Sequence, residues 1–176
     1  MLNVKITKYG SNVLRESAQP VEEITDEIKQ IVDQMLGTMY AADGVGLAAP
    51  QIGISKRIIT VDVNPYDASH EPLILINPEI VDREGQADAE EGCLSVPEIS
   101  GTVKRAEKVT VEGLNMDGEK VRIEATELLA RALQHEIDHL NGTLFIDHLG
   151  RLKHQLIRKQ LRKIENRTRE TESRDS

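Results

Sequence analysis

The sequence predicts an α+β fold in which largely antiparallel sheets pack around a central helix, with a further helix at the C-terminus. Segments rich in branched apolar residues, at 57–63, 73–81, 108–114 and 119–125, indicate strands. These segments do not alternate regularly with helical ones, as a parallel α/β fold would require. The 176 residues suit one domain with a real core. Because only 2% of them are aromatic, we expect a core of Leu, Ile, Val and Ala.

The first helix is predicted over residues 25–42. Thr25 suits the N-cap, and Asp26 and Glu27 suit the first turn. The apolar residues that follow recur at helical spacing and end before Asp43-Gly44. The pattern therefore predicts an amphipathic helix with one face toward the core.

A hairpin and a second helix are predicted downstream. Residues 108–114 and 119–125 flank Asp117-Gly118, a pair typical of a tight β-turn. The second helix begins near Thr126 and contains the sequence LQHEIDHLNG, residues 133–142. We expect this helix to be the central one.

The last segment is basic. A final amphipathic helix is predicted over about residues 149–165, and residues 168–176 are expected to be disordered because they are polar, charged and terminal. Residues 151–169 hold eight Lys or Arg and one Glu, a formal charge of +7. Because the whole chain has a net charge of −8, the remaining residues together carry −15. This run is either a solvated helix face or a docking surface for an anionic partner such as RNA. Its apolar side is predicted to consist of Leu152, Leu156, Ile157, Leu161 and Ile164.

The sequence also bears on the compartment. It has no apolar run near 18 residues, so no membrane span is expected. The N-terminal residues lack the apolar region of a secretory signal. The single cysteine, Cys93, cannot form an internal disulfide. We therefore expect a cytoplasmic protein.

The central helix carries an H-E-x-x-H motif formed by His135, Glu136 and His139. Residues four apart lie on one face of a helix, so both histidines can direct a nitrogen at one ion. Glu136 is rotated by about 100° from His135, so it flanks the ion and can reach a water bound there. Histidine pairs also occur on helix surfaces, but this helix is otherwise apolar, and buried histidines need partners. The motif therefore indicates a metal site.

Three candidates for a third ligand follow from the chain. A third histidine, as in metzincins, would fall at position 145, which is Phe145, and His148 comes three residues too late. Glu165, a thermolysin-like choice, lies in the basic segment with no site around it. Cys93 remains, in EEGCLSVP, where Gly92 permits a close approach of the backbone. Alone, such a cysteine is more often a buried apolar residue. Three protein ligands leave a position open for water, which is the catalytic pattern.

Three segments together resemble the signature motifs of the peptide deformylase family. They are GVGLAAPQIG at 44–53, EGCLS at 91–95 and QHEIDHLNG at 134–142, and they occur in the family's order and spacing. The resemblance extends over about residues 4–150, and the C-terminal helix resembles the bacterial form. It implies a catalytic deformylase domain over residues 1–150. Residues 151–176 would add the basic helix and disordered tail of the same domain.

The resemblance implies an enzyme that hydrolyses the N-formyl group from the N-terminal methionine of newly made proteins and releases formate. Metal-bound hydroxide would attack the formyl carbonyl in that family. The cofactor would be one Fe²⁺ per chain, for which Zn²⁺, Ni²⁺ or Co²⁺ can substitute. The partners would be N-formyl-methionyl nascent peptides and, through the basic helix, the ribosome. The implied metal ligands are Cys93, His135 and His139; the catalytic groups are Glu136 as general base and acid and Gln51 with the N–H of Leu94 as oxyanion donors; the substrate-binding residues are Val45, Gly46 and Glu91.

One departure and two rival interpretations remain. Arg131 and Ala132 stand where relatives often carry larger apolar residues, so the shape of the methionine pocket is open. A metallopeptidase could use the same H-E-x-x-H motif. A metal-dependent binding module without catalysis is the other alternative, and Glu136 beside an open metal position argues against it.

Overall fold

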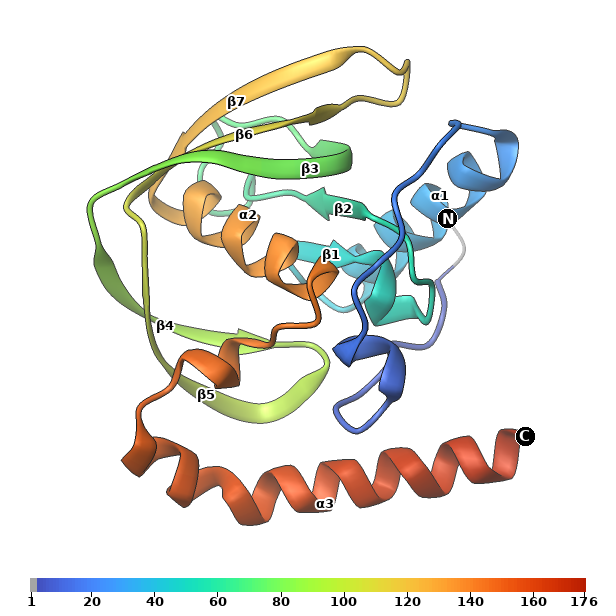
Figure 1. Ribbon diagram of the computed structural model, residues 1–176, viewed down its shortest axis with the longest axis vertical. Helices are drawn as coiled ribbons and strands as arrows, with labels where there is room; N and C mark the ends of the chain where they lie inside the picture. The colour runs from blue at the N-terminus through green and yellow to red at the C-terminus, as the bar shows by residue number, and fades with distance from the viewer. Residues whose placement is uncertain (1–2) are drawn as a thin grey trace.

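The computed structural model describes residues 3–176 and places helix α2 (Glu127–Leu140) between two antiparallel sheets (Figure 1). The larger sheet has five strands in the order β1-β2-β3-β6-β7, and the smaller has the two strands β4 and β5. The predicted α+β fold with a central helix is therefore confirmed. The strands of the larger sheet are β1 (Gly46–Ala48), β2 (Ile58–Val61), β3 (Leu73–Glu84), β6 (Lys108–Leu114) and β7 (Lys120–Thr126).

Helices cover both faces of the larger sheet near β2. Ile58 packs in a cluster with helix α1 (Asp26–Ala41), whereas Ile59 and Val61 pack in a cluster with α2. Successive strand residues point to opposite faces, so a strand between two helices needs apolar residues at every position. This explains why all four residues of β2 are buried and why Ile58, Ile59 and Val61 do not alternate with exposed polar residues.

The strongest local signals gave the predicted elements. The side chain of Thr25 caps α1 by accepting a hydrogen bond from the Ile28 backbone N–H at 3.4 Å. β6 and β7 form the predicted hairpin, and Gly118 in its turn has φ +78°. α2 begins directly after Thr126. Three 3₁₀ turns in the described residues, η1 (Asn12–Arg15), η2 (Ala49–Ile52) and η3 (Phe145–His148), lie outside these elements.

The hairpin of β4 (Ala87–Cys93) and β5 (Val96–Arg105) was not predicted. β4 is mostly exposed and rich in acidic residues, so it has no apolar alternation. β5 does alternate between buried and exposed positions, but Gly101 and Arg105 occupy two of its buried positions. The spacing of apolar residues therefore does not predict either strand. The hairpin matters because Cys93 ends its first strand.

The C-terminal helix α3 (Arg151–Asp175) corrects two expectations. It continues through the tail expected to be disordered, where no Gly or Pro interrupts the helix. Leu152 and Leu156 were placed on its apolar side, yet they are 71% and 68% exposed. Its buried side consists of Ile157 and Leu161.

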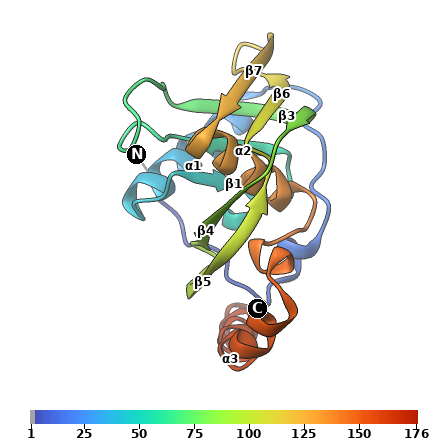
Figure 2. The same ribbon diagram turned by 90° about the vertical axis from the view of Figure 1, so that its left-hand side faces the viewer.

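Helix α3 lies along the outer side of the β4–β5 hairpin, away from α2. Figure 2 shows it almost end-on below that hairpin. Ile157 and Leu161 pack there with residues of β5 and η3. Within residues 3–176, no helix is both long and apolar enough to cross a membrane.

Substitutions at Gly142 and Gly118 measure how closely the end of α2 packs against the N-terminal region. Gly142 follows α2 with φ +73°, and a Cβ there would lie 2.6 Å from the carbonyl oxygen of Arg15. Gly118 has a similar φ of +78° but nothing within 4 Å of an added Cβ. We expect Gly118→Ala to lower the free energy of unfolding by about 1–2 kcal/mol through backbone strain alone. Gly142→Ala should cost a further 1–3 kcal/mol, roughly, through overpacking.

Urea denaturation of the two variants beside the native chain measures this difference. Because both positions require a positive φ, Gly118→Ala is the matched control for strain. Equal losses would show that the backbone near Arg15 yields without cost.

Candidate metal centre

Cys93, His135 and His139 converge on one point. One potential ligand atom from each residue lies within 4.8 Å of the others. Cys93 ends β4, and its Sγ lies 3.4 Å from Nε2 of His139. The two histidines stand one turn apart on the same face of α2. The structure thus brings together the three residues expected to hold a metal.

The surroundings of these side chains fit a divalent cation. Nδ1 of His135 is hydrogen-bonded to Glu91 at 2.9 Å, which leaves Nε2 for an ion. Burial, followed by the nearby charge of His135, lowers the pKa of His139 well below its usual value. The neutral imidazole is the form that binds metals. One thiolate and two imidazoles suit zinc, iron and similar ions.

Glu91 connects the ligands to the surrounding structure. Its carboxylate accepts hydrogen bonds from Arg105 at 2.6 and 2.9 Å and from Arg131 at 2.5 Å, besides its contact with His135. Burial raises the pKa of Glu91, but the bonds from His135 and Arg105 outweigh it and lower this pKa to about 2. Arg105 also binds Asp138 on α2 at 2.9 Å. Glu91 is therefore ionised and fixes the orientation of His135.

Glu136 is buried beside the ligands. Its Oε2 has no hydrogen-bond partner among residues 3–176. Burial raises its pKa to about 7, although the charges of His135 and Arg105 act in the opposite direction. A Cβ on Gly46 would lie 2.6 Å from the other carboxylate oxygen, Oε1. Gly46 thus leaves just enough space for this carboxylate.

Gln51 lies in the 3₁₀ turn η2 (Ala49–Ile52) with its amide held at both ends. Its Oε1 accepts a hydrogen bond from the Ala48 N–H at 2.9 Å. Its Nε2 donates to Ser95 Oγ at 3.2 Å and lies 3.5 Å from Cys93 Sγ. Leu94 and Ser95 form the two-residue turn between β4 and β5. The structure therefore brings Gln51 and Leu94 to the metal ligands, as the motifs predicted.

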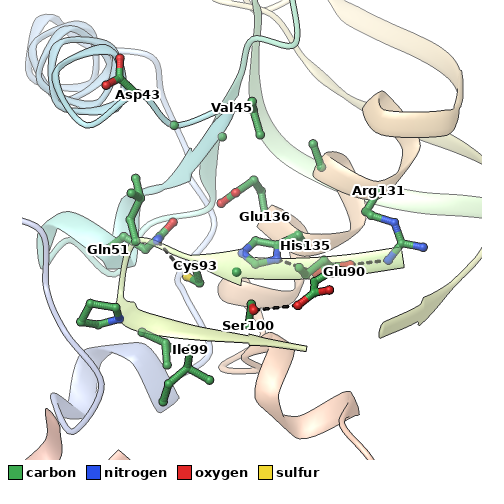
Figure 3. A pocket seen from close by; sticks show the side chains of 18 of the residues that line it. Asp43, Val45, Gln51, Glu90, Cys93, Ile99, Ser100, Arg131, His135 and Glu136 are labelled. Carbon is green, nitrogen blue, oxygen red and sulfur yellow. Dashed lines mark hydrogen bonds and ion pairs between the residues drawn. The ribbon is translucent and has the colours of Figure 1, made fainter. Parts of the chain in front are cut away.

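These residues border one open cavity of about 770 Å³ (Figure 3). One wall is formed by Val45 and Gly46 at β1, which is an edge strand of the larger sheet. β4 forms the opposite wall. Arg131 and Ala132 also line the cavity, and the Arg131 guanidinium is satisfied by Glu91 and the carbonyls of Ala87 and Val103. Every site residue named from the sequence lies at or beside this cavity.

Sequence reasoning missed the residues that hold the site together. Arg105 shares two hydrogen bonds with Glu91, and Ser95 holds the amide of Gln51. Lys8, which also lines the cavity, was not considered. Arg105 did leave a signal, because it is a charged residue at a buried position of an alternating strand. Such a residue needs a buried partner of opposite charge.

Comparison with known proteins decides the family, because residues 3–155 match the family described as polypeptide deformylase. The chain belongs to this family. It is 49% identical over 162 residues to a peptide deformylase of Thermodesulfovibrio yellowstonii, covering 92% of this chain and 98% of that protein. A Halothermothrix orenii peptide deformylase is 56% identical over 154 residues, covering 88% of this chain and 98% of the relative.

Solved structures agree. A Legionella pneumophila peptide deformylase superposes with a TM-score of 0.83 at 43% identity and covers 97% of this chain and 98% of its own. A Synechococcus elongatus peptide deformylase in complex with actinonin has a TM-score of 0.84 at 44% identity, covering 89% of this chain and 87% of its own. The enzyme is a metal-dependent hydrolase that removes the N-formyl group from formylated nascent peptides.

The three ligands predict the behaviour of one substitution. Cys93→Ala removes the thiolate and leaves two imidazoles, so we expect the affinity for a divalent ion to fall by at least about tenfold. Ser100→Ala, at an exposed position of the same hairpin, is the control and should bind metal normally. Metal content after dialysis against a weak chelator measures both. Full retention of the ion by Cys93→Ala would contradict the ligand assignment.

Proposed function

We propose that Glu136 is the general base and acid of deformylation and that Gln51 and the Leu94 N–H hold the oxyanion. The observation that carries this proposal is the buried carboxylate oxygen of Glu136, which has no partner among the described residues and lies beside the three ligands. A buried group with a raised pKa at the edge of a cavity is typical of a catalytic acid or base. The other carboxylate near the ligands, Glu91, is engaged by two arginines and His135.

The reaction needs a strong nucleophile because a formamide is a stable amide. A divalent ion held by Cys93, His135 and His139 supplies Lewis acidity, which makes a water ionisable near neutral pH. Glu136 accepts the proton of the attacking water and later delivers it to the departing peptide amine. A pKa of about 7 suits both transfers, because the carboxylate can gain and lose the proton near neutrality.

The developing negative charge on the formyl oxygen needs donors fixed in advance. The Gln51 amide is such a donor, because Ala48 and Ser95 already hold it. The Leu94 N–H is the second, and it lies in a tight turn directly after Cys93. Donors that do not reorient during the reaction stabilise the transition state without a reorganisation cost.

We propose that the peptide binds as an added strand in the cavity. β1 and β4 are each at the edge of a sheet and both border the cavity, so their outward backbone groups can bind an extended chain. Val45 and Gly46 supply one wall, and Glu91 with its arginines supports the other. Backbone pairing ignores the side chains beyond the first residue. That suits an enzyme that acts on the formyl-methionine end of many different proteins.

Two substitutions test the assignment of Glu136 and Gln51. Glu136→Gln removes the base but keeps the shape of the side chain, so formate release from a formyl-Met tripeptide should fall by about 10²–10⁴. Gln51→Ala removes one oxyanion donor, and kcat should fall by about 10²–10³. Both should still bind one metal per chain. Gln155→Ala, at an exposed position of α3, is the control. Near-native turnover by Glu136→Gln would exclude it as the base.

We further propose that the working ion is Fe²⁺, with Zn²⁺, Ni²⁺ or Co²⁺ able to replace it. The donor set supports this choice because a thiolate and two imidazoles suit each of these ions. Iron has one disadvantage at an open site. A cysteine ligand beside a redox-active ion is exposed to oxidation by O₂ or peroxide.

The metal therefore sets the lifetime of the enzyme in air. Protein loaded anaerobically with Fe²⁺ should lose activity on exposure to air faster than the same protein loaded with Ni²⁺ or Zn²⁺. Time courses of formate release, with Cys93 oxidation followed by mass spectrometry, measure this. Equal half-lives for all three ions would count against a redox-sensitive site.

We propose that α3 docks on ribosomal RNA and that the enzyme works in the cytoplasm, where nascent chains emerge. The support is the exposure of the basic residues of α3, while Ile157 and Leu161 anchor the helix to the hairpin. Exposed cations near an RNA surface bind by releasing counterions. The exposed basic residues in the middle of the helix are Arg158, Lys159, Arg162 and Lys163.

Replacing these four residues with Gln tests the docking without removing the packed face of α3. Ribosome affinity in co-sedimentation should fall for the variant, and the native affinity should fall as salt rises. Arg122→Gln, at an exposed position of β7, is the control. A ribosome affinity that does not change with salt concentration would refute an RNA contact. Turnover of a free tripeptide should be unaffected.

A further inference from the structure

Three consecutive residues near the N-terminus contact both proposed oxyanion elements. The Thr7 N–H donates to the Gln51 carbonyl at 2.7 Å. The ammonium group of Lys8 donates to the Leu94 carbonyl at 2.7 Å. The Tyr9 N–H donates to the Ser95 carbonyl at 2.8 Å. We call residues 7–9 the N-terminal brace. It joins η2 to the turn of the β4–β5 hairpin.

These two elements need such a connection because they belong to different parts of the fold. η2 follows β1 of the larger sheet, whereas Leu94 and Ser95 form the turn of the separate hairpin. Within the site, Gln51 touches the hairpin through Ser95 Oγ and Cys93 Sγ. Oxyanion donors act only when their spacing is held to within a fraction of an ångström. The brace supplies three further bonds across this junction.

Of the three bonds made by the brace, only the bond from Lys8 comes from a side chain. Bonds from Thr7 and Tyr9 come from the backbone, so most substitutions there would keep them. Lys8 lines the cavity, yet its ammonium group donates to the carbonyl of Leu94, the residue whose N–H is the proposed second oxyanion donor. A hydrogen bond from a cation is about twice as strong as one between neutral groups.

Helix α3 supports the brace from outside. A Cβ on Gly10 would lie 2.9 Å from the Glu165 Cα, so the two backbones are nearly in contact. Tyr9 and Ile164 pack against the same cluster of buried residues. Residues 5–8 and the C-terminal half of α3 also border a common groove. The brace is thus held between α3 and the active site.

We propose that the N-terminal brace sets the relative position of the two oxyanion donors and that Lys8 is a positioning residue for deformylation. This inference rests on the proposed roles of Gln51 and the Leu94 N–H. Without the Lys8 ammonium group, the 94–95 turn loses the hydrogen bond that this cation donates to the Leu94 carbonyl. The Leu94 N–H then moves relative to Gln51, and the transition state is stabilised less than the bound substrate.

The test compares Lys8→Met with Lys8→Arg in the metal-loaded full-length enzyme. Lys8→Met keeps the length of the side chain and removes the donor, and we expect kcat on a formyl-Met tripeptide to fall about tenfold or more. KM should stay within about twofold, and the metal content should be native because the ligands do not change. Tm should fall by no more than about 8 °C, the effect of losing one charge-assisted hydrogen bond. Lys8→Arg keeps a charged donor and should recover most of the loss. Lys5→Met, beside the same groove but away from the cavity, is the matched control and should be native.

The outcomes separate this inference from the proposed function. Native kcat in Lys8→Met, together with slow turnover in Gln51→Ala, would overturn the role of the brace alone. Native kcat in Gln51→Ala would overturn the oxyanion assignment, and the brace with it. An equal loss in Lys5→Met, or no recovery in Lys8→Arg, would also overturn the positioning role. A loss of kcat confined to Lys8→Met and restored by Lys8→Arg supports it.

Discussion

The carboxylate of Glu91 is the interaction on which the rest of the site depends. It joins β4 to β5 through Arg105, and to α2 through Arg131 and His135. Cys93 lies two residues farther along β4, so the same carboxylate sets the distance between the thiolate and the histidines. A buried ion pair gains little net stability, but removing one partner leaves an uncompensated charge and costs about 3–5 kcal/mol. The network therefore specifies one arrangement of hairpin and helix rather than adding much stability.

This arrangement also explains why two similar carboxylates take different roles. Glu91 is surrounded by cationic donors and stays ionised, whereas Glu136 is buried with one oxygen unpartnered and has a raised pKa. Glu91 is hydrogen-bonded to Nδ1 of His135, and Glu136 is the next residue of α2. Glu91 holds the imidazole in place, and Glu136 is the proposed general base and acid. The difference arises from neighbours contributed by three separate elements, not from the residue type.

The sequence was most informative where the signal was local. Helix α1 with its Thr25 cap, the β6–β7 hairpin and the pairing of His135 with His139 each depend on spacing within a few residues. The three motifs then predicted the remaining site residues by resemblance. Contacts between distant segments left weaker signals. β4 has too few apolar residues to read as a strand, and Arg105 gave only an unusual charge in an alternating pattern.

In the C-terminal helix, the local pattern predicted more buried residues than the structure contains. Helical spacing predicts Leu152 and Leu156 among the buried residues, but their side chains are 71% and 68% exposed. Periodicity locates an apolar face without showing how much of it is covered. The helical tail also contains i,i+4 contacts such as Arg169 with Glu165, which composition does not reveal.

The contact between Gly46 and Glu136 has a consequence for inhibitor design. A side chain at position 46 would displace the carboxylate of Glu136, the proposed general base, so we expect substitution there to cost activity. An inhibitor that binds the β1 backbone beside Gly46 therefore contacts a surface that substitution can hardly alter. Resistance is then expected at other positions of the cavity wall, such as Leu128, whose side chain takes no part in the Glu91 network.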